Sequence, residues 1–268
     1  MATNRRTFLK GAGATVVGAG FCAPILAAWT KARAGGGSEA HPELRWGMVI
    51  DTKKCLQNQQ NGGCDACSSA CHQIHNVPTI PEPKRHEIKW IWREIYEHAF
   101  PNSNHSFTHD GLKGKPVTVL CNHCERPPCV RVCPTKATWK RETDGIVMMD
   151  MHRCIGCRYC MAGCPYGARS FNYVDPRPHL EKQGLLRDEF PSRTKGVVEK
   201  CNFCAERIAQ GQFPACVEAC QVKNGANAAL AFGNLYDPES SVAKLLRESH
   251  SIRRKPTLGT EPHVFYLV

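Results

Sequence analysis

The sequence predicts an α+β protein made of two cysteine-rich units, one of which interrupts the other along the chain, and three observations support this prediction. Sixteen of the 17 cysteines fall into four groups of four, and every group ends in a Cys-x-x-x-Cys pair. Strand-forming residues precede the first and last groups, in WGMVID at 46–51 and GVVEK at 196–200. The segment that joins the second and third groups contains an Asp-Gly step, which predicts a hairpin between 138–141 and 146–150.

The first residues have the pattern of an export signal. Arg5 and Arg6 lie in NRRTFLK, an apolar run rich in glycine and alanine follows, and an Ala-Arg-Ala step ends it. This order predicts a twin-arginine signal over residues 1–34, with Cys22 inside it. We therefore expect the chain to use the twin-arginine translocation machinery and to work in the periplasm or on the outer face of the cytoplasmic membrane. Cleavage after Ala34 and retention of the signal as an anchor are both open.

The third cysteine group, CIGCRYCMAGCP, has the spacing that binds [4Fe–4S] clusters in bacterial ferredoxins. The second group, CNHCERPPCVRVCP, differs by having four residues between its second and third cysteines. Three closely spaced thiols curl around one cluster, and the N–H groups of the loop then point towards its sulfur atoms. Pro134 and Pro165, which follow the fourth cysteines, favour an extended backbone that lets each fourth thiol reach the neighbouring cluster. We therefore predict a ferredoxin-like inner unit whose two clusters exchange one ligand.

The first and last groups are predicted to pair in the same way, which makes the outer ferredoxin-like unit discontinuous in sequence. Their motifs are less regular, because eight residues separate Cys55 from Cys64 and eleven separate Cys204 from Cys216. We interpret the polar insert LQNQQNGG as a loop whose length adds little to the cost of closure, and the assignment of Cys55 depends on this interpretation. The predicted ligand sets are Cys55, Cys64, Cys67 and Cys220 for cluster 1; Cys201, Cys204, Cys216 and Cys71 for cluster 2; Cys121, Cys124, Cys129 and Cys164 for cluster 3; and Cys154, Cys157, Cys160 and Cys133 for cluster 4.

These pairings divide the chain into predicted segments. The first insertion contains HEIKWIWREIYEHAF, whose alternating apolar residues predict a strand that leads into a loop. In the C-terminal extension, Asp237 and Pro238 are predicted to cap a short helix with Val242, Leu245 and Leu246 on one apolar face. The predicted boundaries are 43–80 plus 196–235 for the outer unit, 115–180 for the inner unit, 81–114 and 181–195 for insertions, and 236–268 for the C-terminal extension.

Zinc is the main alternative to iron–sulfur clusters, because CNHC and CNFC each resemble half of a zinc ribbon. Zinc gives no reason for the repeated third cysteine and Cys-x-x-x-Cys ending, so we favour [4Fe–4S] clusters and retain a zinc-binding interaction module as the alternative. Disulfides explain only the even number of cysteines, and thiolates that hold iron before export are not free to form them. His72, His75 and His123 are expected to pack or hydrogen-bond near the clusters.

The formal net charge of +11 invites a nucleic-acid function. The first 34 residues contain five Lys and Arg and no acid, which leaves +6 for the rest of the chain. Four oxidised clusters with their thiolates contribute about −8, so the loaded chain carries about −2 and we predict no nucleic-acid partner. Lys53, Lys54, Arg153 and Lys200 stand beside cluster loops, where they are expected to offset this charge.

The sequence contains no nucleophile–base constellation, P-loop or dinucleotide-binding fingerprint outside the signal, so we predict no catalytic residue. Four one-electron centres without a substrate site predict an electron carrier rather than an enzyme. No stretch after residue 34 reaches the roughly 20 apolar residues of a membrane-spanning helix. We therefore expect a membrane partner to hold the carrier peripherally.

From Trp46 to Val268 the chain resembles the four-cluster ferredoxin-like electron-transfer subunits of respiratory oxidoreductases. The resemblance lies in HNVP at 75–78, CNHCERPPC, CIGCRYCMAGCPYGARSFNY, FGNLYDPESSV and GTEPHVFYL. Within this family, CPYGARSFNYVDPRP and an export signal of its own make the chain most similar to the periplasmic ferredoxin subunit of the Dsr membrane complex of sulfate and sulfur metabolism. This resemblance implies two partners, an integral quinone-reactive membrane subunit and a multihaem cytochrome c. The iron–sulfur β-subunit of a molybdopterin oxidoreductase is the alternative, and the signal counts against it, because such subunits usually travel on the signal of their catalytic partner.

Overall fold

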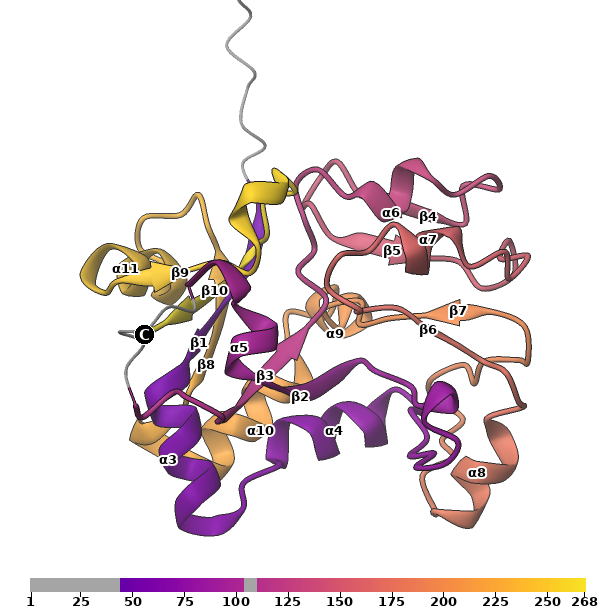
Figure 1. Ribbon diagram of the computed structural model, residues 1–268, viewed down its shortest axis with the longest axis horizontal. Helices are drawn as coiled ribbons and strands as arrows, with labels where there is room; N and C mark the ends of the chain where they lie inside the picture. The colour runs from indigo at the N-terminus through magenta and orange to yellow at the C-terminus, as the bar shows by residue number, and fades with distance from the viewer. Residues whose placement is uncertain (1–43, 104–109) are drawn as a thin grey trace, which may run out of the picture. The chain divides into compact units, whose positions relative to one another are not determined.

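The computed structural model describes residues 44–103 and 110–268, and the predicted signal lies outside these ranges (Figure 1). Within them, short helices are mixed with short and mostly antiparallel strands, which confirms the α+β class. No helix in these ranges has the length and apolar character needed to cross a bilayer. The strands are β1 (Trp46–Asp51), β2 (Ile91–Ile95), β3 (Pro116–Leu120), β4 (Thr138–Lys140), β5 (Val147–Met149), β6 (Ser170–Phe171), β7 (Val198–Glu199), β8 (Leu230–Asn234), β9 (Ser251–Ile252) and β10 (Val264–Leu267). The α-helices are α3 (Thr52–Gly62), α4 (Ala66–Ile74), α5 (Tyr96–Ala99), α6 (Pro128–Arg131), α7 (Tyr159–Ala162), α8 (Arg177–Lys182), α9 (Ala205–Ile208), α10 (Ala215–Asn224) and α11 (Ser241–Glu248).

The largest sheet joins segments from the two ends of the described chain. Its strand order is β8-β1-β10-β9, with β1 parallel to β10 and antiparallel to β8. Met48 and Ile50 of β1 belong to the main hydrophobic core, whereas Val49 packs with Val242 and Leu267 on the other face. Both faces of β1 are therefore covered, which explains why the predicted strand at its position is an uninterrupted apolar run.

Helix α11 covers the second face of this sheet. The Ser240 hydroxyl caps the helix by accepting a hydrogen bond at 3.1 Å from a backbone N–H of the first turn. The predicted cap at Asp237 and Pro238 is wrong, because the Asp237 carboxylate accepts instead from a backbone N–H in the turn before the helix. The predicted apolar face is confirmed, since Val242 and the two leucines of α11 pack against the sheet.

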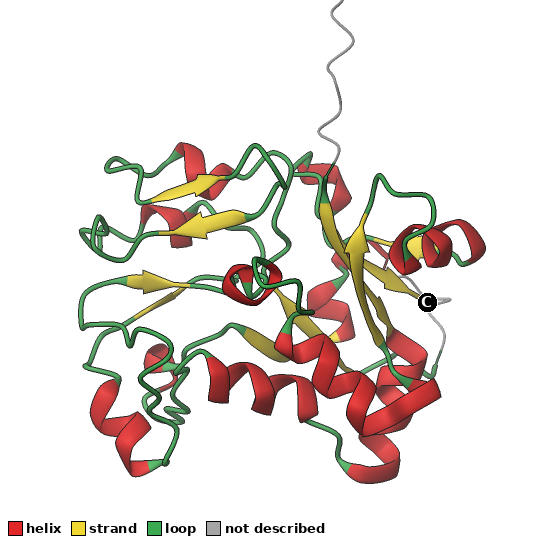
Figure 2. Cartoon of the chain, turned by 180° about the vertical axis from the view of Figure 1, so that it is seen from behind, coloured by secondary structure: helices red, strands yellow, loops and turns green. Residues whose placement is uncertain are grey.

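The remaining strands form three antiparallel pairs, β2–β3, β4–β5 and β6–β7, as Figure 2 shows from behind. The pair β4–β5 is the predicted hairpin, with Thr138 opposite Met149. Gly145 in its turn has a φ of +77°, and an added Cβ would lie 2.3 Å from the Arg45 side chain. Glycine is therefore required there both by the backbone conformation and by the close approach. The predicted strand at 196–200 shortens to β7.

Two segments predicted as loops are helical. LQNQQNGG contributes most of α3, which begins where the Asp51 carboxylate accepts from the Lys54 N–H at 3.0 Å and ends before Gly63, at a φ of +58°. Only Thr52 and Leu56 of α3 are buried, so its polar residues form the outer side of a helix. The predicted strand of the first insertion is β2, but it leads into α5 rather than into a loop.

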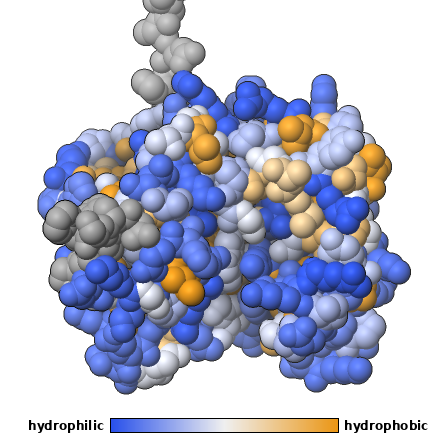
Figure 3. Space-filling view, viewed as in Figure 1, coloured by the Kyte–Doolittle hydropathy of each residue, from blue (hydrophilic) through white to orange (hydrophobic). Residues whose placement is uncertain are grey.

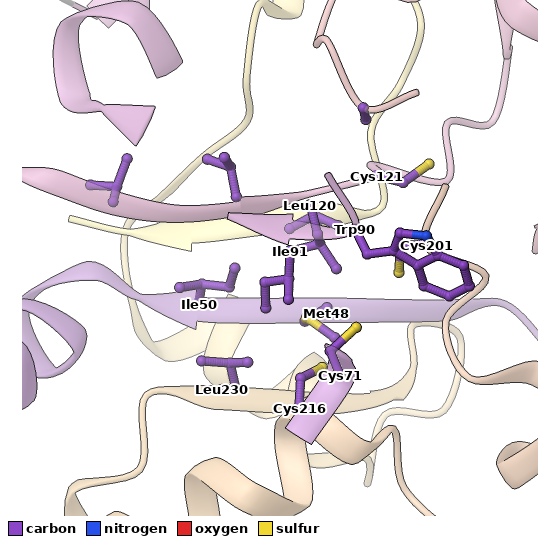
Figure 4. Packing of buried hydrophobic residues seen from close by; sticks show 14 of the residues in the cluster. Met48, Ile50, Cys71, Trp90, Ile91, Leu120, Cys121, Cys201, Cys216 and Leu230 are labelled. Atoms are coloured by element: carbon purple, nitrogen blue, oxygen red, sulfur yellow. The ribbon is translucent and has the colours of Figure 1, made fainter. Parts of the chain in front are cut away.

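The main hydrophobic core includes several cysteine side chains. Helices α4 and α10, which are far apart in sequence, pack against each other below the sheet in the view of Figure 1. In Figure 4 the apolar side chains of β1, β2, β3 and β8 meet the thiols of Cys71, Cys121, Cys201 and Cys216 within one cluster of buried residues. The core thus fixes the elements that carry the predicted cluster ligands.

Candidate iron–sulfur site

The sixteen cysteines of the predicted ligand sets are all free thiols, and each is buried or half-buried. None of them forms a disulfide in the part of the chain that the structure describes. Their positions relative to one another can be followed through the electrostatic effect of each thiolate on its neighbours, because this effect falls off with distance.

The four cysteines predicted for cluster 1 come together from segments far apart in sequence. Burial and the negative charges of Cys55, Cys220 and Cys64 raise the pKa of Cys67 to about 12. Cys55 therefore lies with the other three, even though the insert that follows it is helical and not a loop. Backbone support is present as well, since an N–H group donates to the Cys220 Sγ at 3.3 Å.

The four cysteines predicted for cluster 2 are more deeply buried. Burial, followed by the charges of Cys201, Cys216 and Cys204, raises the pKa of Cys71 well above its usual value. Two backbone N–H groups donate to the Cys201 and Cys204 sulfurs, each at 3.4 Å. Helix α4 thus brings Cys71 to three thiols that belong to the last cysteine group.

The four cysteines predicted for cluster 3 line one cavity, together with Arg169 and the apolar side chains of Val147 and Ala168. Burial, then the charge of Cys121 and then the charges of Cys129 and Cys164 raise the pKa of Cys124 to about 12. Cys164 therefore lies with the cysteines of the second group, as the predicted exchange requires.

The four cysteines predicted for cluster 4 lie nearer the surface. Burial raises the pKa of Cys160, the Arg169 charge lowers it, and the charges of Cys129 and Cys154 raise it further. Partial burial raises the pKa of Cys133, but backbone and hydroxyl hydrogen bonds outweigh burial and lower it overall. Cys133 follows α6, and α6 packs against α7, the helix that contains Cys160. The assignment of each cysteine to a cluster stays a prediction in all four sets.

The donor sets fit iron–sulfur clusters on chemical grounds. Burial and mutual repulsion raise the pKa of thiols such as Cys67, Cys71 and Cys124, and bound metal would offset the charge of their thiolate forms. Soft thiolates in fours, with backbone N–H groups directed at their sulfurs, are the environment that such clusters use. Cys154 follows the same pattern and accepts from the Val198 N–H at 3.4 Å. A bound cluster would supply one-electron transfer, and the chain would hold it and keep water away.

Two buried cations lie among the thiols, and only one of them is among the cations predicted from the sequence. Lys200 is 2% exposed, whereas Lys53 and Arg153 face solvent, where water screens their charge. The other buried cation is Arg169, which was not predicted from the sequence. It is 4% exposed and donates to the Cys129 Sγ at 3.1 Å. The sequence does contain one indication of this burial, because Arg169 lies in GARSF, a run of mostly small and apolar residues. An arginine that is buried in such a run needs a partner.

The histidines near the cysteine groups pack and hydrogen-bond as expected. The His75 Nε2 lies 2.6 Å from a Glu206 carboxylate oxygen, and its ring stacks on Trp90 with centroids 4.8 Å apart. The His123 ring stacks on Phe203 at 3.7 Å. These rings fill the space between thiol sets.

Known proteins are similar to this chain over most of its length. A family model described as a 4Fe-4S dicluster domain matches residues 115–176 and 187–229, which contain the last three cysteine groups. The Hdr-like menaquinol oxidoreductase iron–sulfur subunit 1 of Archaeoglobus fulgidus is 42% identical, over 98% of this chain and 97% of that protein. The menaquinone reductase iron–sulfur cluster-binding subunit of Nitratidesulfovibrio vulgaris is 37% identical, over 84% of this chain and 89% of its own length. A putative dimethyl sulfoxide reductase iron–sulfur subunit of Halobacterium salinarum is also 37% identical, over 83% of this chain and 78% of its own length.

These matches decide between iron and zinc. The dicluster model covers the last three cysteine groups, and relatives that extend over the first group are iron–sulfur subunits as well. The chain carries four [4Fe–4S] clusters and functions in electron transfer. It therefore belongs to the family of ferredoxin-like [4Fe–4S] iron–sulfur subunits of oxidoreductase complexes.

Proposed function

We propose that the chain is the periplasmic electron-transfer subunit of a membrane-bound respiratory complex, and that it passes electrons between a quinone-reactive membrane subunit and a multihaem cytochrome c. The names of two relatives refer to menaquinol and menaquinone, which supports a quinone-linked partner. The twin-arginine pattern supports the periplasmic location. The resemblance carried by CPYGARSFNYVDPRP supports a role in sulfate and sulfite metabolism.

The observation that carries this proposal is that each proposed ligand set adjoins the next. The charge of Cys67 in set 1 raises the pKa of Cys216 in set 2. In the same way, Cys121 of set 3 raises the pKa of Cys201 in set 2. Cys129 of set 3 raises the pKa of Cys160 in set 4. The ligand sets and the discontinuous outer unit are part of the proposal. A row of four adjoining one-electron sites has two ends, which is the arrangement that an electron carrier between two partners needs.

The end of the row at cluster 4 is the surface proposed for the membrane subunit. Val132, Ile155 and Tyr159 stand beside cluster-4 cysteines and are 39%, 66% and 62% exposed. Figure 3 shows apolar residues gathered over the region of α6 and α7, at the upper right of the view. Permanent subunit interfaces are more apolar than transient ones. The outer side of α3, near cluster 1, is polar and is the surface proposed for the multihaem cytochrome c.

Changing Ile155 and Tyr159 to glutamate together is expected to release the chain from the membrane fraction, because two charges would have to be buried in the interface. The measurement is the distribution of the chain between membrane and soluble fractions after cell fractionation. The control is Leu186→Glu, which adds a charge at a residue that is also exposed but lies in the second insertion. Equal release by the control, or full retention of the double variant, would contradict this interface.

Metal analysis of the anaerobically purified protein is expected to give about sixteen irons and about as many acid-labile sulfides per chain. The reason is that each of the four sets supplies a complete coordination shell of thiolates. Four to eight zincs per chain and a colourless protein would exclude electron transfer altogether.

Purification of the native complex in mild detergent tests the proposed partners. The expected result is co-purification with an integral membrane protein and a multihaem cytochrome c, and reduction of the iron–sulfur clusters by added menaquinol. The alternative is the iron–sulfur subunit of a molybdopterin oxidoreductase, favoured by the relative named as a putative dimethyl sulfoxide reductase subunit. Recovery of a molybdopterin enzyme in place of the cytochrome would replace the proposal with that alternative.

A further inference from the structure

Five arginine and lysine side chains are buried in the described part of the chain, and two of them have carboxylate partners. Arg45 lies 3.6 Å from Glu125, and Arg193 lies 2.6 Å from Glu199. The other three form no ion pair with any described residue and are Arg169, Lys200 and Arg254. A buried cation without a counter-charge is unfavourable, and the negative charge of a bound cluster with its thiolates would stabilise these three.

Arg169 lines the cavity assigned to cluster 3, and Lys200 and Arg254 lie against residues that line it. Arg169 donates from Nη2 to the Cys129 Sγ at 3.1 Å and to the Thr138 hydroxyl at 2.9 Å. The guanidinium carbon of Arg254 lies 5.4 Å from the ring centre of Tyr166, which lines the same cavity. Arg169 is thus part of the cavity wall, and Arg254 lies against Tyr166 of that wall.

Lys200 approaches the same cavity from the side of cluster 2. Its ammonium donates to the Cys201 carbonyl at 2.7 Å and to the carbonyl of Val147, which lines the cavity. Among thiolates, Cys121 acts on it most strongly, followed by Cys201 and Cys129. Two of these three belong to the proposed ligand set of cluster 3.

The Arg169 charge also acts on Cys160 of the cluster 4 set, and the Lys200 charge also acts on Cys201 of the cluster 2 set. Cluster 3 is the set whose cavity all three cations approach. The Glu206 carboxylate adds negative charge beside Cys204 of cluster 2. Lys53, near cluster 1, is exposed. Arg153, near cluster 4, is also exposed and forms an ion pair with Asp150. Solvent screens exposed charges, whereas buried charges are screened much less.

We propose that Arg169, Lys200 and Arg254 make cluster 3 the centre of highest reduction potential in the chain, so that the first electron taken up resides there. This inference rests on the proposed ligand sets and is independent of the proposed partners. Reduction adds one electron and neither makes nor breaks a bond to the protein, so it increases the negative charge of the site by one. Buried positive charge stabilises that added electron and raises the potential.

The test is an anaerobic redox titration of the purified holoprotein followed by electron paramagnetic resonance, with dithionite as reductant. In Lys200→Met and Arg169→Gln, the highest midpoint potential is expected to fall by at least about 59 mV, which corresponds to a tenfold change in a one-electron equilibrium. Lys200→Arg keeps the charge and is expected to restore most of the potential. The control Lys53→Met removes an exposed cation beside cluster 1 and is expected to leave the highest potential unchanged.

The signal must also be assigned to its cluster. Cys124→Ser, in the proposed ligand set of cluster 3, is expected to remove or shift the signal with the highest potential, and this test needs no change to the cations. A highest potential that stays constant in both charge-removing variants with full iron content would overturn the proposal, and so would a Cys124→Ser protein that keeps this signal. Either result would leave the electron-carrier function intact, whereas absence of iron in the wild-type protein would remove both.

Discussion

Replacing Cys164 by serine is expected to abolish cluster 3 and to leave cluster 4 in place, although Cys164 ends the cysteine group that supplies three ligands of cluster 4. The pKa of Cys164 is raised by burial and then by the charge of Cys121, and its side chain lines the cavity of the cluster 3 set. A serine hydroxyl is a harder and far less acidic ligand than a thiol. Iron content should fall from about sixteen to about twelve per chain, with loss of one paramagnetic signal.

Cys157→Ser provides the matched control, because Cys157 belongs to the same sequence motif but to the proposed set of cluster 4. The two variants are expected to lose different signals in electron paramagnetic resonance spectra of the dithionite-reduced protein. If both lost the same signal, each cysteine group would bind its own cluster, and the exchange of fourth ligands between groups would be wrong.

The inner hairpin could be predicted from the sequence because its determinants are local. An Asp-Gly step between two strand-forming segments fixes the turn, and Gly145 must be glycine both for its positive φ and for the approach of Arg45. The cysteine groups could be recognised for the same reason, because the spacing within each group is a local feature of the sequence. The parallel pairing of β1 with β10 is different, because nothing within 46–51 indicates that its partner lies at 264–267.

Helix α3 could have been predicted from its ends. Asp51 and Gly63 are ordinary start and stop signals, but the polar residues between them suggested a loop because they lack an apolar face. Burial was the property least accessible from the sequence. Lys53 and Lys200 both stand within two residues of a cysteine in the chain, yet of these two only Lys200 is enclosed, because residues distant in sequence cover it.

Replacing Arg193 by methionine is expected to lower the free energy of unfolding by about 3–5 kcal/mol, the cost of leaving one member of a buried ion pair without its partner. Arg193 and Glu199 have side chains that are 0% and 1% exposed, 2.6 Å apart. The Arg193 guanidinium also donates to the Asn76 carbonyl at 2.8 Å, so it ties the second insertion to the segment after α4. A loss of 3 kcal/mol corresponds to a melting temperature lower by about 6–12 °C for a chain of this size, measured anaerobically at one scan rate.

The double variant Arg193→Met/Glu199→Gln separates the charge from the packing. Trp90 and Asn172 donate to the Glu199 carboxylate at 2.7 and 2.6 Å, and a glutamine carbonyl can still accept from one of them. With no unpaired charge left, we expect the double variant to be more stable than Arg193→Met alone. Arg177→Met removes an exposed pair with Asp175 and should change stability by at most about 1 kcal/mol. A double variant as unstable as Arg193→Met would mean that the lost contacts of the guanidinium, and not the isolated carboxylate, cause the instability.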